Sequence, residues 1–314
     1  MKYIFFGTPK FAEIVLEKLI DAGYLPEAVV CNPDEPVGRK QILTPPPVKS
    51  FVRDHETWNI KILQPVKLDA SFKFQVPSFK PDLAIVVAYG KIIPEEILSI
   101  PRLGFLNVHG SLLPKYRGAS PIQSAILNGD KETGITIMKI DEKMDHGKII
   151  SSAKIKISND DNYEILSQKL AICGAELLIK TIPGYLSGKI KPTEQDHSQA
   201  TYTKIITKED GKIDWSKSAE EIKRMIRAFY PWPSAWTRVN LKSQISNLKI
   251  MEADISDSKG SHKIGEVFLL NSNLAIKCGK SALIIKQLQL EGGKIITAKE
   301  FLNGHKDFIG VNLG

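Results

Sequence analysis

The sequence predicts an α/β protein in two parts, a parallel sheet covered on both faces followed by a small antiparallel β-barrel. In the first half, unbroken apolar runs of β type alternate with helical patterns, which is typical of a parallel sheet covered by helices. In the last third, short β-type runs follow one another between Asn, Ser and Gly residues, which indicates antiparallel strands. A length of 314 residues with 42% hydrophobic residues is enough for two such domains.

The strands of the parallel sheet are expected at short apolar runs along the first half. Between the first two runs, Phe11 to Ala22 has apolar residues at helical spacing, and Gly23 marks the end of that helix. The Gly7–Lys10 turn has one glycine instead of the three of the dinucleotide fingerprint, so NAD binding is disfavoured despite the Rossmann-like alternation. The expected strands are Tyr3–Phe6, Ala28–Cys31, Asn59–Leu63, Leu83–Ala88 and Phe105–Val108.

A polar stretch at residues 190–206 reads as a linker, which divides the chain into a first domain at 1–189 and a second at 207–314. In the second domain, capping boxes at Ser218–Glu221 and Thr297–Glu300 mark the starts of two helices. The β-type runs expected to form the barrel are Leu248–Met251, Gly265–Leu270, Leu274–Lys277 and Leu283–Leu290.

Positive charge is concentrated in the C-terminal part. Residues 201–314 contain 18 Lys and Arg against 12 Asp and Glu, which accounts for +6 of the net charge of +8. Such a module can bind nucleic acid or another polyanion. On charge alone, a solvated Lys-rich surface is the favoured interpretation.

One connection is unusually long. The segment Pro33–Pro47 interrupts a β–α connection that is normally short, and Arg39 and Lys40 lie at its middle. Structureless loops of this length are uncommon and are either functional or disordered. A binding loop and a mobile surface loop are equally compatible with the sequence.

The composition favours a cytoplasmic protein without a membrane anchor. No uncharged apolar run approaches the roughly 18 residues of a membrane-spanning helix. The N-terminus begins directly with a strand pattern and has no signal-peptide features. Cys31, Cys173 and Cys278 are odd in number and far apart, which favours reduced thiols over a disulfide framework or a zinc site.

The most informative residues for function are Asn107 and His109, at the end of an apolar run. Residues two apart on a strand share one face, so both side chains are expected to point into the same space. Parallel sheets bind ligands at the carboxyl ends of their strands, where this pair lies. An amide donor beside a titratable ring is suited to stabilising a carbonyl that becomes an oxyanion.

A third candidate is Asp145, on a turn that follows the β-type run Gly134–Ile140. Its carboxylate could reach His109, orient the ring and favour its charged form. Each of these residues alone is more often a structural residue, and the functional interpretation depends on their combination. No His-Glu-x-x-His, Gly-x-Ser-x-Gly or P-loop is present. His109 and His146 lack a third ligand at suitable spacing, so no metal is expected.

Several motifs carry a resemblance to a known family. They are Phe6–Pro9, Val86–Pro94, Asn107–Gln123, Gly134–Met138, Met144–Gly147 and Arg227–Pro233. Along nearly the whole chain, these segments strongly resemble the folate-dependent formyltransferases. The Asn-x-His…Asp set is specific to that family, and the segments Pro36–Lys40 and Pro231–Pro233 resemble its members that act on a tRNA.

The resemblance implies a Rossmann-like formyltransferase domain and an oligonucleotide-binding-type (OB-like) barrel. It implies formyl transfer from 10-formyltetrahydrofolate to the α-amino group of methionyl initiator tRNA, by a protein that we expect to be a monomer and metal-free. Asn107, His109 and Asp145 would be the catalytic residues, and Arg39 and Lys40 would contact the tRNA. The residues expected to line the folate pocket are Ser111, Leu112, Leu113, Pro114, Val86, Val87, Ala88, Tyr89, Gly90 and Ile92.

Three alternatives remain open at this point. The chain could be a formyltransferase for a small amine, such as a nucleotide-sugar or a glycinamide, or a hydrolase that releases formate from the same folate. It could also be a nucleic-acid-binding module with a non-catalytic first domain, although the Asn-x-His…Asp set argues against that.

Overall fold

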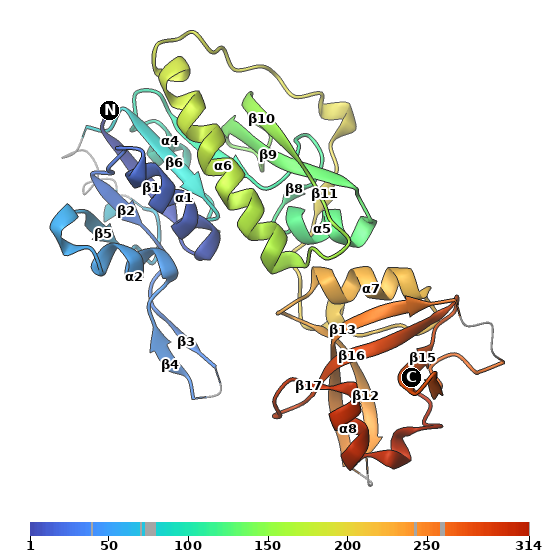
Figure 1. The fold of residues 1–314 in the computed structure, drawn as a ribbon. Helices are drawn as coiled ribbons and strands as arrows, with labels where there is room; N and C mark the ends of the chain where they lie inside the picture. Colours follow the sequence, from blue (N-terminus) through green and yellow to red (C-terminus); the bar gives the residue numbers. More distant parts are fainter. Residues whose placement is uncertain (39, 70, 73–79, 242–243, 258–260, 314) are drawn as a thin grey trace. The chain divides into compact units, whose positions relative to one another are not determined.

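Figure 1 shows the fold in a computed structural model, which describes the chain apart from residues 39, 70, 73–79, 242–243, 258–260 and 314. The chain divides into two compact units. The first comprises residues 1–121, 132–156 and 167–204, and the second comprises residues 122–131, 157–166 and 205–314. Within the described ranges, none of the helices has the length and apolar character needed to cross a membrane.

A seven-stranded sheet forms the centre of the first unit. Five strands are parallel to their neighbours, which confirms the predicted parallel sheet, while β9 pairs antiparallel with β7 and β10 pairs antiparallel with β9. In order across the sheet, the strands are β10 (Ile149–Lys156), β9 (Glu132–Lys139), β7 (Phe105–His109), β6 (Leu83–Val87), β1 (Tyr3–Gly7), β2 (Ala28–Val30) and β5 (Lys61–Leu63).

The two faces of this sheet are buried by different groups. On one face, Phe6 of β1 packs its ring 5.4 Å from the rings of both Tyr89 and Phe105. On the other face, α6 (Tyr163–Leu186) approaches closely, since a Cβ added at Gly174 would lie 2.8 Å from Val108. Because Val108 faces α6, its neighbours Asn107 and His109 face the opposite side of β7.

Among the described residues of the N-terminal sequence, the other helices are shorter than α6. They are α1 (Lys10–Asp21), α2 (Pro47–Arg53), η1 (Glu56–Trp58), α4 (Glu95–Leu98) and α5 (Pro121–Asn128). The structure confirms the predicted helix after the first strand as α1. A two-stranded parallel pair, β8 (Arg117–Gly118) with β11 (Tyr202–Thr203), joins the loop after β7 to the stretch predicted as a linker.

The sequence suggested that the long Pro33–Pro47 connection is structureless, and this prediction is wrong. The connection contains an antiparallel hairpin of β3 (Glu35–Val37) and β4 (Ile42–Thr44), whose strand residues are all exposed. Gly38 and Gln41 adopt positive φ angles of 72° and 49° in its turn. Lys40 is exposed in that turn, and Arg39 lies outside the described residues.

The second unit is built on an antiparallel half-barrel sheet, which confirms the predicted antiparallel β-domain. Ile222 and Ile226 of α7 lie in the same buried cluster as Leu248 and Leu288 of the sheet, together with Phe301 of α8. The strands of this unit are β12 (Ala235–Leu241), β13 (Gln244–Ser256), β14 (Val267–Leu270), β15 (Asn273–Lys277), β16 (Ala282–Leu290) and β17 (Ile296–Thr297). Its described helices include α7 (Ala219–Ala228), α8 (Ala298–Gly304) and the short η4 (Glu209–Gly211) and η5 (Lys306–Phe308). Another short helix, η3 (His197–Gln199), lies in the first unit.

Two arginines of α7 explain why short pieces of the N-terminal sequence belong to the second unit. Arg224 donates from Nε to the Leu127 carbonyl at 3.0 Å. Arg227 donates from Nη1 to the carbonyls of Ser158 and Asp161, at 3.2 and 2.9 Å. These bonds hold Leu127, Ser158 and Asp161, all assigned to the second unit, against α7.

Both predicted capping boxes are present, at Ser218 with Glu221 and at Thr297 with Glu300. The Ser218 hydroxyl accepts from the Glu221 backbone N–H at 3.2 Å, and the Glu221 carboxylate accepts from the backbone N–H of Ser218 at 2.9 Å. The side-chain and backbone hydrogen bonds from Ser218 lower the pKa of Glu221.

Replacing the cap, Ser218→Ala, is expected to lower the free energy of unfolding by about 1 kcal/mol at neutral pH. Because folding lowers the pKa of Glu221, its stabilisation is complete above the unfolded-state pKa and is lost as the pH falls through the folded one. The difference between variant and parent is therefore expected to shrink in acid. Urea unfolding followed by tryptophan fluorescence measures both effects, and equal stabilities at neutral pH would contradict the contribution of the cap.

Candidate active site

Strand β7 places Asn107 and His109 at the carboxyl edge of the first sheet. Asn107 lies opposite Val86 of β6 and Met138 of β9, and His109, the last residue of the strand, lies opposite Thr136 of β9. His109 is buried, with 5% of its surface exposed. The predicted placement of the pair on one face at this edge is therefore present in the structure.

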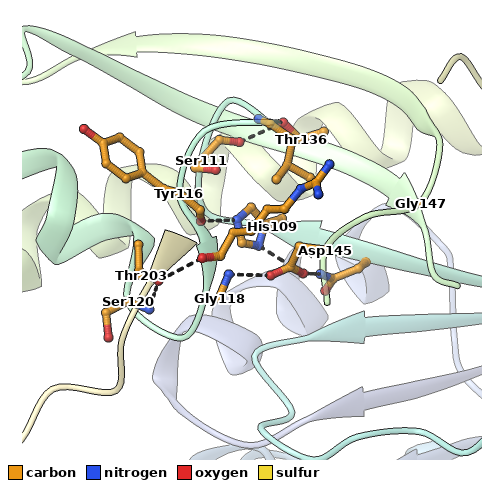
Figure 2. A network of polar contacts seen from close by, with 12 residues as sticks. His109, Ser111, Tyr116, Gly118, Ser120, Thr136, Asp145, Gly147 and Thr203 are labelled. Atoms are coloured by element: carbon orange, nitrogen blue, oxygen red, sulfur yellow. Dashed lines mark hydrogen bonds and ion pairs between the residues drawn. The ribbon is translucent and has the colours of Figure 1, made fainter. Parts of the chain in front are cut away.

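The carboxylate of Asp145 lies against both side chains, and Figure 2 shows its contact with His109. Its Oδ1 is 3.4 Å from Nδ2 of Asn107 and 3.5 Å from Nδ1 of His109. Its Oδ2 accepts a 2.8 Å hydrogen bond from the backbone N–H of Gly118. The structure thus brings together the three residues predicted as catalytic.

The second ring nitrogen of His109 also faces an acceptor. Its Nε2 lies 3.0 Å from the carbonyl oxygen of Tyr116. The ring of His109 therefore lies between two acceptors, the Asp145 carboxylate and the Tyr116 carbonyl.

Thr136 of β9 holds the loop that follows this pair. The Thr136 hydroxyl donates to the Ser111 carbonyl at 2.7 Å (Figure 2). It also accepts from the Leu113 backbone N–H at 3.0 Å. Ser111 is fully buried, and its hydroxyl donates to the Lys115 carbonyl at 2.6 Å. Leu112 and Pro114, two other candidates for the folate pocket, are partly exposed beside it.

The candidate segment at residues 86–92 continues from the end of β6. Val86 and Val87 are buried in the sheet, and the Tyr89 ring packs in the core against Phe6. Ala88 and Gly90 are exposed and have positive φ angles of 46° and 81°. Ile92 is 88% exposed, so this segment offers apolar side-chain and backbone surface beyond the strand end.

A second histidine lies near the triad without joining it. His146 pairs through Nδ1 with Asp141 at 2.7 Å, and its ring stacks on that of His197 at 4.0 Å. Over the described part of the chain, no three His, Cys, Asp or Glu residues are grouped so that they could hold a metal ion.

Sequence reasoning missed several groups that contact the triad. The Gly118 N–H and the Tyr116 carbonyl lie inside the quoted Asn107–Gln123 motif, but backbone groups leave no side-chain signal. Gln195 donates to the carbonyl of Asp145 at 2.9 Å, although it comes from the stretch predicted as a linker. A single polar residue in a polar stretch gives no pattern by which it could have been found.

Comparisons with known proteins identify the family of this chain. The family model described as "Formyl transferase" matches residues 1–182, and "Formyl transferase, C-terminal domain" matches residues 205–306. The chain belongs to the formyl transferase family. A relative from Halalkalibacterium halodurans, described as methionyl-tRNA formyltransferase, is 44% identical over 307 residues, which covers 97% of this chain and 95% of that protein.

Two solved structures show the same fold. Methionyl-tRNA formyltransferase from Clostridium thermocellum has a TM-score of 0.56 at 18% identity, covering 95% of this chain and 99% of that one. HypX from Aquifex aeolicus, in complex with tetrahydrofolic acid, has a TM-score of 0.63 at 15% identity. That comparison covers 96% of this chain but 47% of HypX.

In this formyl transferase, the turn that presents Asp145 depends on a glycine at 147. A Cβ added there would lie 1.9 Å from the Lys139 carbonyl oxygen. Gly147→Ala is therefore expected to displace the turn and to lower kcat by roughly 100-fold, the typical effect of a 1 Å misplacement. Gly304→Ala is the matched control, because a Cβ at Gly304 has no neighbour within 4 Å. Steady-state kinetics on both variants checks this, and equal kcat values would contradict it.

Proposed function

We propose that this enzyme transfers the formyl group from 10-formyltetrahydrofolate to the α-amino group of methionyl initiator tRNA, giving N-formylmethionyl-tRNA for translation initiation. The single observation that carries the proposal is the convergence of Asn107, His109 and Asp145 at the carboxyl edge of the sheet. The substrate assignment is supported by the full-length similarity to the Halalkalibacterium halodurans methionyl-tRNA formyltransferase.

The reaction exchanges one carbon–nitrogen bond for another. The methionyl amine attacks the formyl carbon, and the carbonyl oxygen becomes an oxyanion. The bond from that carbon to the folate nitrogen then breaks, and the amine proton moves to the departing nitrogen. No protein nucleophile is required, because the amine of the substrate supplies the attacking electron pair.

Asn107 and His109 stabilise the oxyanion in this proposal. The contact of Asn107 with Asp145 is long, at 3.4 Å, so its amide can turn a hydrogen towards a nearby oxyanion. The Nε2 of His109 already binds the Tyr116 carbonyl, which supports an electrostatic contribution from the charged ring rather than a direct bond. Asp145 balances that charge and, through a water molecule, passes the proton from the amine to the folate nitrogen.

The folate site is assigned to the two segments that border the triad. The loop of Ser111, Leu112, Leu113 and Pro114 is fixed to β9 through Thr136, which makes it a rigid wall. In the second segment, Ala88, Gly90 and Ile92 are exposed and would contact a flat ring directly. Val86, Val87 and Tyr89 are buried, so they would contribute backbone groups and support.

The tRNA contacts are assigned to two basic regions. The hairpin β3–β4 carries Lys40 in its exposed turn, next to Arg39 in the sequence. The domain at residues 207–314 contains most of the excess positive charge of the chain. Phosphate groups bind such surfaces with little sequence preference, so these regions would hold the tRNA rather than identify it.

The enzyme is also proposed to work as a cytoplasmic monomer. Its three cysteines are free in the structure, and burial raises the pKa of Cys31 and Cys278 to about 11, which leaves them poorly reactive. Light scattering of the purified protein is expected to give the mass of one chain, and a dimer mass would contradict this part of the proposal.

Asn107→Ala is expected to lower kcat by about 100- to 1,000-fold, the typical loss when one oxyanion donor is removed. His109→Ala, which removes the electrostatic contribution of the ring, is expected to lower kcat as well. The KM values for both substrates should change little, because these groups act in the transition state. His55→Ala, which removes an exposed histidine elsewhere in the unit, is the control.

The assay is formyl transfer from 10-formyltetrahydrofolate with charged initiator tRNA, free methionine or deacylated tRNA as acceptor. Activity with the charged tRNA alone supports the proposal. Activity with free methionine at a similar kcat/KM would favour a small-amine formyltransferase, and formate release without an acceptor would favour a hydrolase.

A further inference from the structure

We propose that Gln195 and Arg117 are positioning residues for the reaction, which together hold Asp145 in the orientation that meets His109. The inference rests on the proposed function, because both residues act through Asp145.

Gln195 fixes the backbone of the turn that carries Asp145. Its Nε2 donates to the carbonyl of Asp145 at 2.9 Å and to that of Gly147 at 2.7 Å. One side-chain amide therefore joins two carbonyls two residues apart. Asp145 needs this support, because its φ of 48° lies in the left-handed region that residues other than glycine rarely adopt.

Arg117 fixes the other end of the same amide. It donates to Oε1 of Gln195 from Nη2 at 2.7 Å and from Nε at 3.3 Å. A guanidinium has donors only, so the amide oxygen must face Arg117 and the NH₂ group must face the two carbonyls. The orientation of the Gln195 side chain is thus determined by its chemistry.

Arg117 is itself held on several sides. Only 2% of its surface is exposed, and it donates from Nη1 to the Tyr202 hydroxyl at 3.2 Å. Its Nη2 lies 2.8 Å from Nδ1 of His197, which accepts that bond. Its backbone pairs with Tyr202 in the β8–β11 ladder. A buried cation with this many partners has little freedom to move away from Gln195.

The two residues close a ring of contacts around Asp145. From Arg117, one route runs through the next residue, Gly118, whose N–H binds the carboxylate of Asp145 at 2.8 Å (Figure 2). The other route runs through Gln195 to the carbonyl of Asp145. Both the side chain and the backbone of Asp145 are therefore held by groups that are connected to the buried Arg117.

Gln195→Glu is the sharpest test of this arrangement. A glutamate keeps the shape and the contact with Arg117, but it places an acceptor where two carbonyl acceptors already lie. The expected result is a fall in kcat of roughly 100-fold, as for a 1 Å misplacement of a reacting group, with KM for both substrates within about twofold. Gln168→Glu, an exposed residue of α6, introduces the same charge and is the control.

A double-mutant cycle with Asp145→Ala separates positioning from general damage. If Gln195 acts through Asp145, Gln195→Glu should cost nothing further in the Asp145→Ala background. An equal fold loss in both backgrounds would overturn the inference. Gln195→Met keeps the side-chain volume but cannot donate a hydrogen bond. It is expected to lower kcat in the parent enzyme and to cause no further loss in Asp145→Ala, and it replaces Gln195→Glu in the cycle if the glutamate variant does not fold.

The outcomes distinguish this inference from the proposed function. Absence of formyl transfer to methionyl initiator tRNA by the unaltered enzyme would overturn the proposed function, whereas near-normal kcat in Asp145→Ala would overturn the role proposed for Asp145 and the inference with it. A strong loss in Asp145→Ala with near-normal kcat in Gln195→Glu would leave the proposed function standing and overturn the positioning role alone.

Discussion

The organisation of this enzyme depends on one carboxylate being held at the edge of the parallel sheet. Asp145 lies in a turn whose backbone conformation is unfavourable for it, and its oxygens receive Asn107, His109 and the Gly118 N–H. A charge in this position needs directed donors, because partial burial makes an unpaired carboxylate costly. The strand, the loop after it and the distant glutamine therefore form one arrangement around a single anion.

This arrangement consists of contacts between residues far apart in the sequence, and the stability of the sheet offsets the conformational entropy lost in forming them. Asn107 and Asp145 are 38 residues apart, and Asp145 and Gln195 are 50 apart. Ordering each group costs conformational entropy that one hydrogen bond does not offset. The apolar cores on both faces of the sheet supply that stability, as Phe6, Phe105 and Val108 illustrate.

The sequence predicted what is encoded locally. Apolar runs identified the parallel strands, and both capping boxes were found because their partners lie three residues apart. The hairpin β3–β4 was missed because its strand residues are exposed and show no burial pattern. The pair Asn107 and His109 followed from strand periodicity, whereas the contact of Gln195 with Asp145 depends on folding that no local pattern encodes.

The choice of a neutral amide at position 195 follows from charge balance around the triad. The buried cation Arg117 is separated from the carboxylate of Asp145 by Gln195 and by the backbone of Gly118. A second carboxylate at 195 would satisfy Arg117 but would add a like charge near Asp145, and like charges repel. With the amide there, Asp145 is the carboxylate that pairs with His109, and the proposed stabilisation of the oxyanion by that ring depends on this pair.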